Sequence, residues 1–392
     1  MKIMFCITNF SHGRGGHFFS LKTTAQALEN SCDISIVNFG FSISKVLQDI
    51  NIKLFFIRYV GFNFLTSLIT FIMKLKRERP DVIHAFDEDA LVFARLGSLI
   101  FKIPLVYTKC GGPNPAGYFP IVKNQIMYSG ENLKFFKEHK FSKNVKFWLI
   151  PNRVGEVITD TVGVKKMYNL AAGRLAVLRI CRISPYYEVS IRQSVEFISK
   201  LKNDGINAVL FVVGAVQDRN FSQIIQNELS SSEVIFVTDD EMTINASKLI
   251  EAADCVVGTG RGLMEAASLK KIVLTPAVNS KIPVLVDDTN INSLLFTNFS
   301  ERNFFPEDKI KVQYEKIVNI LKFKTLKEEY KKIILKIYDD YFNIKSVVGN
   351  YLDLYAHLNF HWRDSFSLNC LLGIFYSFKN VIVKYIKYRF GA

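Results

Sequence analysis

The sequence predicts two α/β domains, each built on a mainly parallel sheet with helices on both faces, followed by a helical tail. The chain has 392 residues, which is more than one ordinary hydrophobic core serves. Short apolar runs of strand length alternate with stretches whose apolar residues recur every three to four positions, as in parallel sheets joined by helices. This alternation occurs twice. The polar, weakly patterned residues 152–169 between the two halves are expected to be a linker.

The first domain is expected over residues 1–155. It begins with an apolar strand, and a turn containing Gly13, Gly15 and Gly16 leads into its first helix. Its second helix should end before Pro80, because the residue before a proline is driven out of the α region. The predicted strands span residues 2–8, 34–39, 81–85, 104–108, 125–129 and 146–150, and the predicted helices span 18–29, 59–79 and 90–101.

The second domain is expected over residues 170–325, and residues 326–392 are expected to form C-terminal helices and a basic tail. The strands of this domain are predicted at residues 175–181, 208–214, 234–238, 255–258 and 272–275, with helices at 190–202, 221–229, 245–253 and 262–269. Three further amphipathic helices are predicted at residues 312–323, 326–341 and 371–389.

Composition narrows the classes of partner. The chain carries 50 Lys and Arg against 36 Asp and Glu, a formal net charge of +14, which favours an anionic partner. Nucleic acid, a phospholipid surface and a diphosphate-bearing substrate all fit that charge, but the basic residues are dispersed and no nucleic-acid recognition motif is found. Six isolated cysteines indicate a reducing cytoplasm and argue against disulfides or a metal site.

Two apolar segments raise the question of membrane contact. Residues 59–73 are fewer than the about 20 needed to span a bilayer, so a buried helix is expected and no transmembrane anchor is predicted. In the last helix, one face collects Leu371, Phe375, Phe378, Ile382 and Ile386, and the opposite face collects Asn380, Lys384 and Lys387. Such a helix either lies on an anionic membrane surface or packs on the domain with its basic side in water.

Glycine turns follow three predicted strands. One contains Gly15 and Gly16, one is Gly214, and one spans residues 258–262 with Arg261 inside it and Glu265 one helical turn later. A helix that starts after a glycine turn can bind phosphate through its free N–H groups and the positive end of its dipole. The third turn also offers a guanidinium for a diphosphate and a carboxylate for a ribose hydroxyl pair.

Residues 252–267 resemble the donor-binding region of the family 4 glycosyltransferases, which are retaining enzymes of the GT-B fold, with two Rossmann-like domains facing a cleft. The resemblance covers about residues 1–355. Further family marks recur in order: Gly15 and Gly16 resemble the acceptor-side glycine loop, residues 81–84 the strand that ends in histidine, residues 150–152 the step into the linker, and residues 178–182 the strand that ends in a donor-binding arginine.

The resemblance implies transfer of a hexose from a UDP- or GDP-linked donor to a carbohydrate or lipid-linked glycan, with retention and without a metal or a further cofactor. It implies catalytic roles for His84, Arg182 and Glu265. It places Gly214, Thr238, Gly260, Arg261, Gly262, Leu263, Met264 and Glu265 at the donor, and Gly15, Gly16, Lys109, Cys110 and Gly111 at the acceptor. A cytoplasmic role in bacterial surface polysaccharide synthesis, peripheral on the inner face of the cell membrane, would follow.

Four positions depart from the family pattern. The first of two expected glutamates falls on Val257, and the basic residue expected five positions after Arg182 is Tyr187. Arg153 stands where a glycine is usual, and Cys110 occupies the place of a common histidine. These changes weaken the catalytic inference more than the fold. A sugar-nucleotide epimerase of the same fold and an inactive glycan-binding or scaffolding relative therefore remain alternatives.

Overall fold

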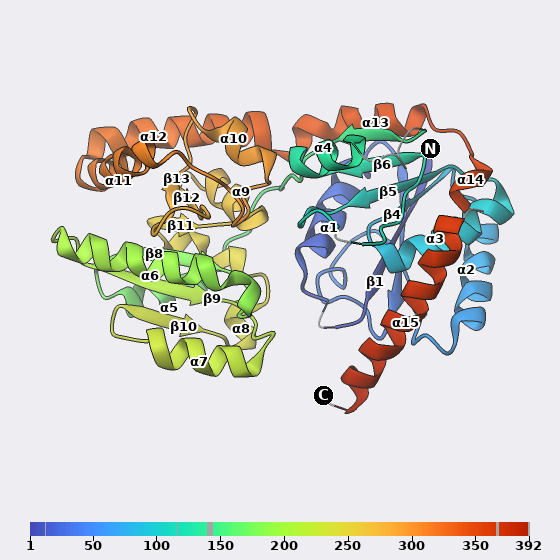
Figure 1. Ribbon diagram of the computed structural model, residues 1–392, viewed down its shortest axis with the longest axis horizontal. Coiled ribbons are helices and arrows are strands. Elements are labelled where there is room, and N and C mark those ends of the chain that lie inside the picture. Colours follow the sequence, from blue (N-terminus) through green and yellow to red (C-terminus); the bar gives the residue numbers. More distant parts are fainter. Residues whose placement is uncertain (12, 116, 139–143, 366–367, 391–392) are drawn as a thin grey trace. The chain divides into compact units, whose positions relative to one another are not determined.

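The computed structural model describes residues 1–11, 13–115, 117–138, 144–365 and 368–390. Contacts between residues divide the chain into two compact units, one made of Met1–Asn152 with Val347–Ala392 and the other of Arg153–Ser346. Each unit is a sheet flanked by helices (Figure 1). The predicted pair of α/β domains with a helical C-terminal segment is confirmed.

The first unit is built on a parallel sheet in the order β3-β2-β1-β4-β5-β6-β7. Strand β1 is buried along nearly its whole length, because helices cover both faces of a parallel sheet and its central strands become continuous apolar runs. The strands are β1 (Lys2–Asn9), β2 (Asp33–Gly40), β3 (Lys53–Arg58), β4 (Val82–Ala85), β5 (Leu105–Lys109), β6 (Asn124–Met127) and β7 (Lys146–Leu149).

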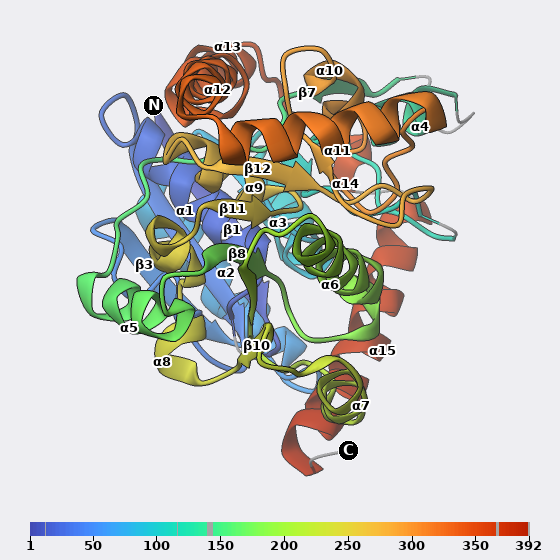
Figure 2. The ribbon, with the colours of Figure 1, turned by 90° about the vertical axis from the view of Figure 1, so that its left-hand side faces the viewer.

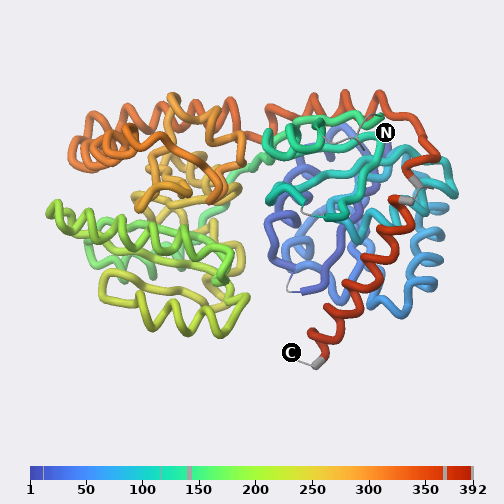
Figure 3. Tube along the Cα trace, viewed as in Figure 1, coloured from blue at the N-terminus to red at the C-terminus, as the bar shows by residue number. Residues whose placement is uncertain are grey.

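The helices of the first unit come from both ends of the chain. Asp87 caps α3 by accepting from the Ala90 backbone N–H. Helix α2 ends at Glu78, and its left-handed C-cap residue Arg79 precedes Pro80. The helices are α1 (Gly16–Leu28), α2 (Phe64–Glu78), α3 (Glu88–Phe101), α4 (Gly130–Glu138), α13 (Val348–Ala356), α14 (Trp362–Ser365) and α15 (Leu368–Phe390). Figure 3 follows the C-terminal helices, in red, back along this unit.

The second unit has a sheet in the order β10-β9-β8-β11-β12-β13, parallel except for the last pair. Figure 2 shows α6 and α7 on one side of this sheet and α5 on the other. Its strands are β8 (Leu175–Ile180), β9 (Ala208–Val213), β10 (Val234–Val237), β11 (Cys255–Val257), β12 (Ile272–Thr275) and β13 (Val284–Leu285). Its helices are α5 (Thr161–Ala171), α6 (Glu188–Asn203), α7 (Arg219–Leu229), α8 (Asp240–Thr243), α9 (Arg261–Ser268), α10 (Ile291–Phe296), α11 (Glu307–Lys322) and α12 (Lys324–Ile337), with 3-10 turns η2 (Pro185–Tyr187), η3 (Ala246–Ala252) and η5 (Ile344–Val347) and the π-turn η4 (Tyr338–Phe342).

Several parts of the chain differ from the sequence-based expectation. Helix α2 was expected to be buried but leaves Leu65, Ile69 and Met73 exposed, and strand β3 was not expected. The expected linker contains α5, which is capped by Asp160 and buries Val164 and Met167. The helix expected at residues 245–253 is the 3-10 turn η3. Residues 326–392 do not form one tail region, because α12 packs in the second unit and α13 to α15 pack in the first.

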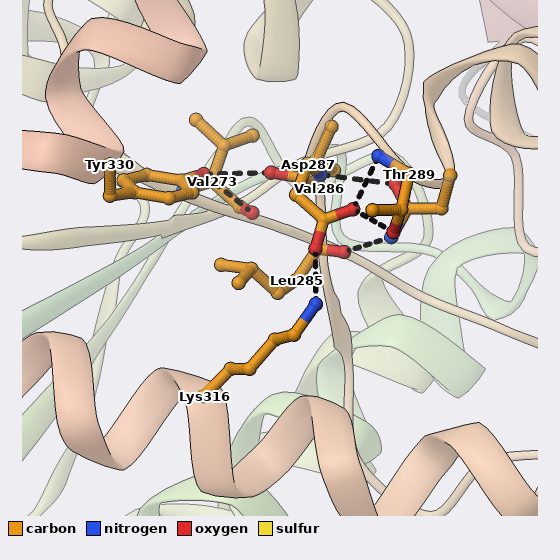
Figure 4. A network of polar contacts seen from close by, with 8 residues as sticks. Val273, Leu285, Val286, Asp287, Thr289, Lys316 and Tyr330 are labelled. Atoms are coloured by element: carbon orange, nitrogen blue, oxygen red, sulfur yellow. Dashed lines mark hydrogen bonds and ion pairs between the residues drawn. The ribbon is translucent and has the colours of Figure 1, made fainter. Parts of the chain in front are cut away.

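A polar network fixes the antiparallel edge of the second sheet (Figure 4). Asp287, just after β13, accepts from Thr289 at the start of α10 and pairs at 3.0 Å with Lys316 of α11. The hydroxyl of Tyr330, on α12, accepts from the Val273 backbone N–H at 3.1 Å and donates to the Val286 carbonyl at 3.0 Å. Helices α11 and α12 are thereby tied to the sheet edge.

Candidate functional site

The turn between β11 and α9 has a backbone that only glycine permits. A Cβ on Gly258 would come within 2.6 Å of the Leu263 backbone nitrogen, closer than real Cβ contacts allow. Gly260 has φ +53 and ψ −122, a conformation that disfavours residues with a side chain. The side chains of Leu263 and Met264 are fully buried, so only their backbone groups are available to a ligand. The turn therefore presents the N-terminal amides of α9 at the carboxyl end of β11, the arrangement that binds anions.

Arg261 and Glu265 form an ion pair beside this turn. Their closest atoms, Arg261 Nη2 and Glu265 Oε1, lie 2.9 Å apart, and both side chains are largely buried. Arg261 also donates to the Arg153 carbonyl at 3.0 Å. Burial raises the pKa of Glu265, while the charge and hydrogen bond of Arg261 lower it. The structure thus joins the residues predicted for ribose and diphosphate into one unit.

Two more guanidinium groups lie at the carboxyl end of β8. Arg182 is exposed and donates to the Tyr187 hydroxyl at 3.1 Å. Arg179 is fully buried, donates to the Val257 carbonyl at 3.3 Å and lies 5.8 Å from the Tyr187 ring centroid. Tyr187, which stands where a basic residue was expected, therefore contacts both arginines. Sequence reasoning missed Arg179, which lies inside an apolar strand.

The Arg179 guanidinium is held by neutral oxygen atoms. Its Nε and Nη2 donate to the Ser190 hydroxyl, and its Nη1 donates to the carbonyls of Ile180 and Val257. Within the described ranges, no carboxylate forms an ion pair with it. A buried cation of this kind raises the local positive potential, and an anion bound nearby would be stabilised.

Gly214 and Thr238 follow β9 and β10 at the same edge of the second sheet. A Cβ on Gly214 would lie 1.5 Å from the Cys181 carbonyl oxygen, so glycine is required there by the packing of the chain alone. Thr238 is half-buried. Both residues lie at the predicted edge of the sheet. The close packing against Cys181 is enough to explain the glycine at position 214.

Two polar atoms near this edge have no hydrogen-bond partner among the described residues. They are the hydroxyl of Ser184, whose residue is 6% exposed, and the side-chain carbonyl oxygen of Asn298. Asn298 lies beside the glycine turn, since a Cβ on Gly260 would be 3.9 Å from its Nδ2. Buried polar atoms without partners are rare in folded proteins, and each calls for an explanation such as a catalytic role or a bound water or ion. Sequence reasoning found neither residue.

The glycine turn of the first unit lies between β1 and α1. Gly13 has φ +64, and its carbonyl accepts from the Ser44 hydroxyl at 2.6 Å. Gly15 is the N-cap of α1, and a Cβ on Gly16 would meet nothing within 4 Å. The predicted acceptor-side glycines thus stand at the N-terminus of α1, with open space at Gly16 and the His17 ring next to Gly15.

His84 lies in the interior of the first unit. It has no exposed surface, and its ring nitrogens are 2.7 Å from the Tyr355 hydroxyl and 2.6 Å from the Thr108 hydroxyl. Burial lowers the pKa of His84 to about 3, so the ring is neutral near pH 7. In this structure the two hydroxyl groups enclose the ring, and the catalytic role of His84 stays a prediction.

The loop after β5 is also organised from within. The Lys109 ammonium donates to the carbonyls of Gly111, at 2.6 Å, and Pro113, at 3.2 Å. Cys110 donates to the Phe86 carbonyl at 3.4 Å, and burial raises its pKa, so its thiol is protonated near neutral pH. Gly111 has φ +81. The side chains of Lys109 and Cys110 therefore hold the shape of the loop. The backbone groups of the loop remain for contact with a ligand.

Asp87 is the titratable carboxyl at this edge of the first sheet. It accepts from the Thr8 backbone N–H at 2.6 Å, from the Thr8 hydroxyl at 2.8 Å and from the Ala90 backbone N–H at 2.8 Å. Burial, helped by the charge of Asp89, raises the pKa of Asp87 to about 7, against the effect of these hydrogen bonds. Asp87 joins β1 to α3.

No protein-family model matches the chain, and no curated protein matches it. Solved structures do match. HepE from Anabaena, in complex with UDP and glucose, has 17% identity and a TM-score of 0.65, over 91% of this chain and 99% of that one. A glycosyltransferase from Rickettsia africae has 14% identity and a TM-score of 0.63, over 90% and 97%. Sucrose-phosphate synthase from Thermosynechococcus elongatus has 13% identity and a TM-score of 0.60, over 91% and 98%. The chain has the GT-B fold.

Proposed function

We propose that this protein is a glycosyltransferase that takes a sugar from a nucleotide diphosphate donor. The observation that carries the proposal is the α9 turn, where open helix amides and the Arg261–Glu265 pair occur at one edge of the second sheet. Arg182 and Arg179 add cations at the end of the neighbouring strand β8. The fold shared with HepE, which was solved with UDP and glucose, supports the proposal.

In the proposed mechanism, the diphosphate of the donor binds at the N-terminal amides of α9. Arg182, which is exposed, contacts the phosphates directly, and Arg179 contributes positive potential from beneath. Glu265 binds the ribose hydroxyls while Arg261 holds its carboxylate and reaches the phosphate oxygens. These groups stabilise the negative charge that develops on the leaving diphosphate. Fixed cations of this kind take the part that a divalent metal has in other transferases, so we propose a metal-independent reaction. Its retaining stereochemistry is proposed from the resemblance to the family 4 glycosyltransferases alone.

The first glutamate of the family pattern, which would contact the donor sugar, is absent, so another residue must make this contact. Val257 is fully buried in β11 and has no polar atom to offer. Asn298 lies beside Gly260, and its side-chain carbonyl oxygen has no partner among the residues that the structure describes. We propose that Asn298 binds a hydroxyl of the donor sugar.

The acceptor is proposed to bind on the first unit. The N-terminus of α1 at Gly15 and Gly16 and the backbone of the loop at Gly111 supply its contacts. His84 positions this loop through Thr108. We propose a carbohydrate or lipid-linked glycan acceptor and a role in bacterial surface polysaccharide synthesis, at the inner face of the cell membrane.

Calorimetric titration with UDP, UDP-glucose and GDP-linked sugars tests the donor site. Arg182→Ala and Glu265→Gln should weaken binding of the preferred nucleotide by at least about tenfold, because each removes a contact to a charged or hydroxyl group. Lys202→Ala is the matched control. Lys202 is an exposed cation of the same unit, lies at the C-terminal end of α6 and pairs with Glu233. If no nucleotide binds, or if all three variants bind equally, the proposal is wrong.

The epimerase and the inactive relative are separated by product analysis. An epimerase converts the nucleotide sugar without an acceptor, whereas a transferase releases nucleoside diphosphate only when an acceptor or water takes the sugar. Val257 and Tyr187 motivate the inactive alternative, because both replace polar or charged residues of the family pattern. Turnover that Arg182→Ala abolishes would eliminate it.

A further inference from the structure

Helix α15 is attached to the first unit by a narrow, largely small-residue face. Cys370, Gly373, Ser377 and Val381, spaced three or four apart, are buried. A Cβ on Gly373 would lie 2.8 Å from the Tyr118 hydroxyl. The helix axis is therefore held close to the domain, and Val381 joins the hydrophobic core of the first unit.

Polar contacts fix this attachment at several points along the helix. The Asn369 side chain accepts from Arg95 of α3 at 2.8 Å, and its backbone carbonyl accepts from the Tyr118 hydroxyl at 2.6 Å. Further along, Lys384 pairs with Asp89 of α3 at 3.1 Å. The inward side of α15 thus combines these polar contacts with the buried Val381 and with ring contacts of Tyr376 to Tyr118 and of Tyr385 to Phe41.

The apolar face of α15 points outward. Leu371 is 61% exposed, Phe375 is 63% exposed, and Phe378 and Ile386 are each more than 40% exposed. These residues follow one another at helical spacing, so they form a continuous stripe. Soluble monomers rarely leave an aromatic and aliphatic stripe of this length in water.

A second exposed apolar stripe lies on α2 and the turn before it. Phe62, Leu65, Ile69 and Met73 are each between 57% and 71% exposed. Both helices pack against α3 (Figure 1). Helix α15 also contacts the turn before α2, where the half-buried Ile382 lies against Gly61, the residue before Phe62. We call these two stripes together the α2–α15 face.

The charges that α2 and α15 themselves carry are mostly basic, although Asp89 of α3 pairs with Lys384 and Glu88 of α3 is exposed. Residues 368–390 contain Lys379, Lys384, Lys387 and Arg389 and no Asp or Glu. Helix α2 ends with Lys74, Lys76 and Arg77, and its only acidic residue, Glu78, pairs with Lys53. An apolar surface with a border of cations complements an anionic phospholipid surface. It does not complement a second copy of itself, because like charges would face one another.

We propose that the α2–α15 face binds the surface of an anionic phospholipid bilayer, with α15 lying in the plane of the interface. Within the described part of the chain, one segment, Trp362–Arg389, has the length and composition of a membrane span, with mean hydropathy 1.4 and 20% of its window buried. Crossing would break the contacts of Asn369 and Lys384 with α3 and would place Lys379 and Lys384 in hydrocarbon, at a cost of several kcal/mol. Lying flat keeps these contacts and still buries the apolar stripe.

Vesicle flotation of the full chain tests this proposal independently of catalysis. Phosphatidylcholine vesicles that contain phosphatidylglycerol should bind the protein, vesicles of phosphatidylcholine alone should bind it less, and added salt should weaken the binding. Leu371→Ser with Phe375→Ser, and separately Leu65→Ser with Ile69→Ser, should each weaken binding by about tenfold or more. Each pair removes apolar surface that the lipid would bury. The control is Ile158→Ser with Ile224→Ser, since both residues are exposed in the second unit.

Each other outcome overturns the proposal. Equal binding of both double variants and wild type, or no binding to either vesicle, would show that this face does not meet lipid. Retention on the vesicles after alkaline carbonate extraction would show that α15 crosses the bilayer. A concentration-dependent dimer in sedimentation velocity that the same variants abolish would assign the face to a second copy of the chain. Circular dichroism and thermal melting confirm that the variants are folded.

Discussion

The carboxyl edges of the two sheets carry similar sequence marks but differ in how their polar groups are used. At the edge of the second unit, Arg182 is exposed and Asn298 keeps an oxygen without a partner among the described residues. At the edge of the first unit, His84 and Asp87 are buried and hydrogen-bonded from several sides. A motif residue on a strand end can therefore serve a ligand or the scaffold, and hydrogen-bond partners decide which.

The largest effect that sharpens this comparison is expected at Gly258. Gly258→Ala places a Cβ within 2.6 Å of backbone atoms, so the turn must move and nucleotide binding should be lost. We expect the free energy of unfolding to fall by about 3 kcal/mol or more, which is typical of a severe steric conflict. Denaturant unfolding and calorimetric titration with UDP measure the two effects.

Gly262→Ala is the matched control for Gly258→Ala. A Cβ on Gly262 would meet nothing within 4 Å, and alanine favours a helix over glycine by about 1 kcal/mol. This variant should be as stable as wild type or more so. If Gly258→Ala were equally stable and bound UDP normally, the turn would not be the rigid element we describe.

The next effect concerns the first unit and depends on pH. Burial lowers the pKa of His84 to about 3 from an ordinary value of 6.5, so between these values the unfolded chain binds more protons at this site than the folded chain. Stability from His84 is therefore complete above about pH 6.5 and is lost as pH falls towards 3. Between pH 6.5 and 4.5 the loss should reach about 2–3 kcal/mol.

His84→Gln isolates this contribution, because glutamine can hydrogen-bond but does not titrate. We expect the difference in unfolding free energy between wild type and His84→Gln to shrink by about 2–3 kcal/mol as pH falls from 6.5 to 4.5. Asp87 titrates in an overlapping range in both proteins, so it cancels in this difference. An unchanged difference would mean that His84 is accessible to water, which would favour its predicted catalytic role.

How well the sequence predicted these two edges depends on where the determining contacts lie. The strands and most helices were predictable because burial on both faces of a parallel sheet leaves long apolar runs, as in β1 and β9. Strand β3 was missed because it is an edge strand and half-exposed. Helix α5 was missed because its buried residues are few within a polar stretch.

The site was predictable where its geometry is local. The glycines and the Arg261–Glu265 pair fall within one turn of chain, and the structure brings them together. The state of His84 was not predictable, because it depends on Tyr355, which is 271 positions away in sequence. Arg179 and Asn298 lay in segments without a motif, so only their surroundings identify them.

A moderate effect should separate binding from stability. Arg182→Ala should weaken UDP binding by about 10- to 100-fold, the range for losing one charge-assisted contact, and leave the unfolding free energy nearly unchanged because Arg182 is exposed.

Lys109→Ala should lower stability and leave UDP binding unchanged, since buried Lys109 holds the carbonyls of Gly111 and Pro113. We expect it to lose about 1–3 kcal/mol of stability with UDP affinity unchanged. If Lys109→Ala instead weakened UDP binding, Lys109 would belong to the donor site.

The smallest effect is expected at Asn298, and it tests which part of the donor this residue contacts. Asn298→Ala removes one hydrogen-bonding group worth about 1 kcal/mol, so affinity for a UDP-sugar should fall about fivefold while affinity for UDP stays the same. Asn298 has φ +55, a conformation that asparagine tolerates better than alanine. Asn298→Gly therefore serves as the control for backbone strain, because glycine accepts this conformation and also lacks the amide. Both variants should show the same selective loss. If UDP affinity fell equally in both, Asn298 would bind the nucleotide, and the sugar contact would have to come from another residue, with Ser184, whose buried hydroxyl has no partner in the described ranges, the next to test.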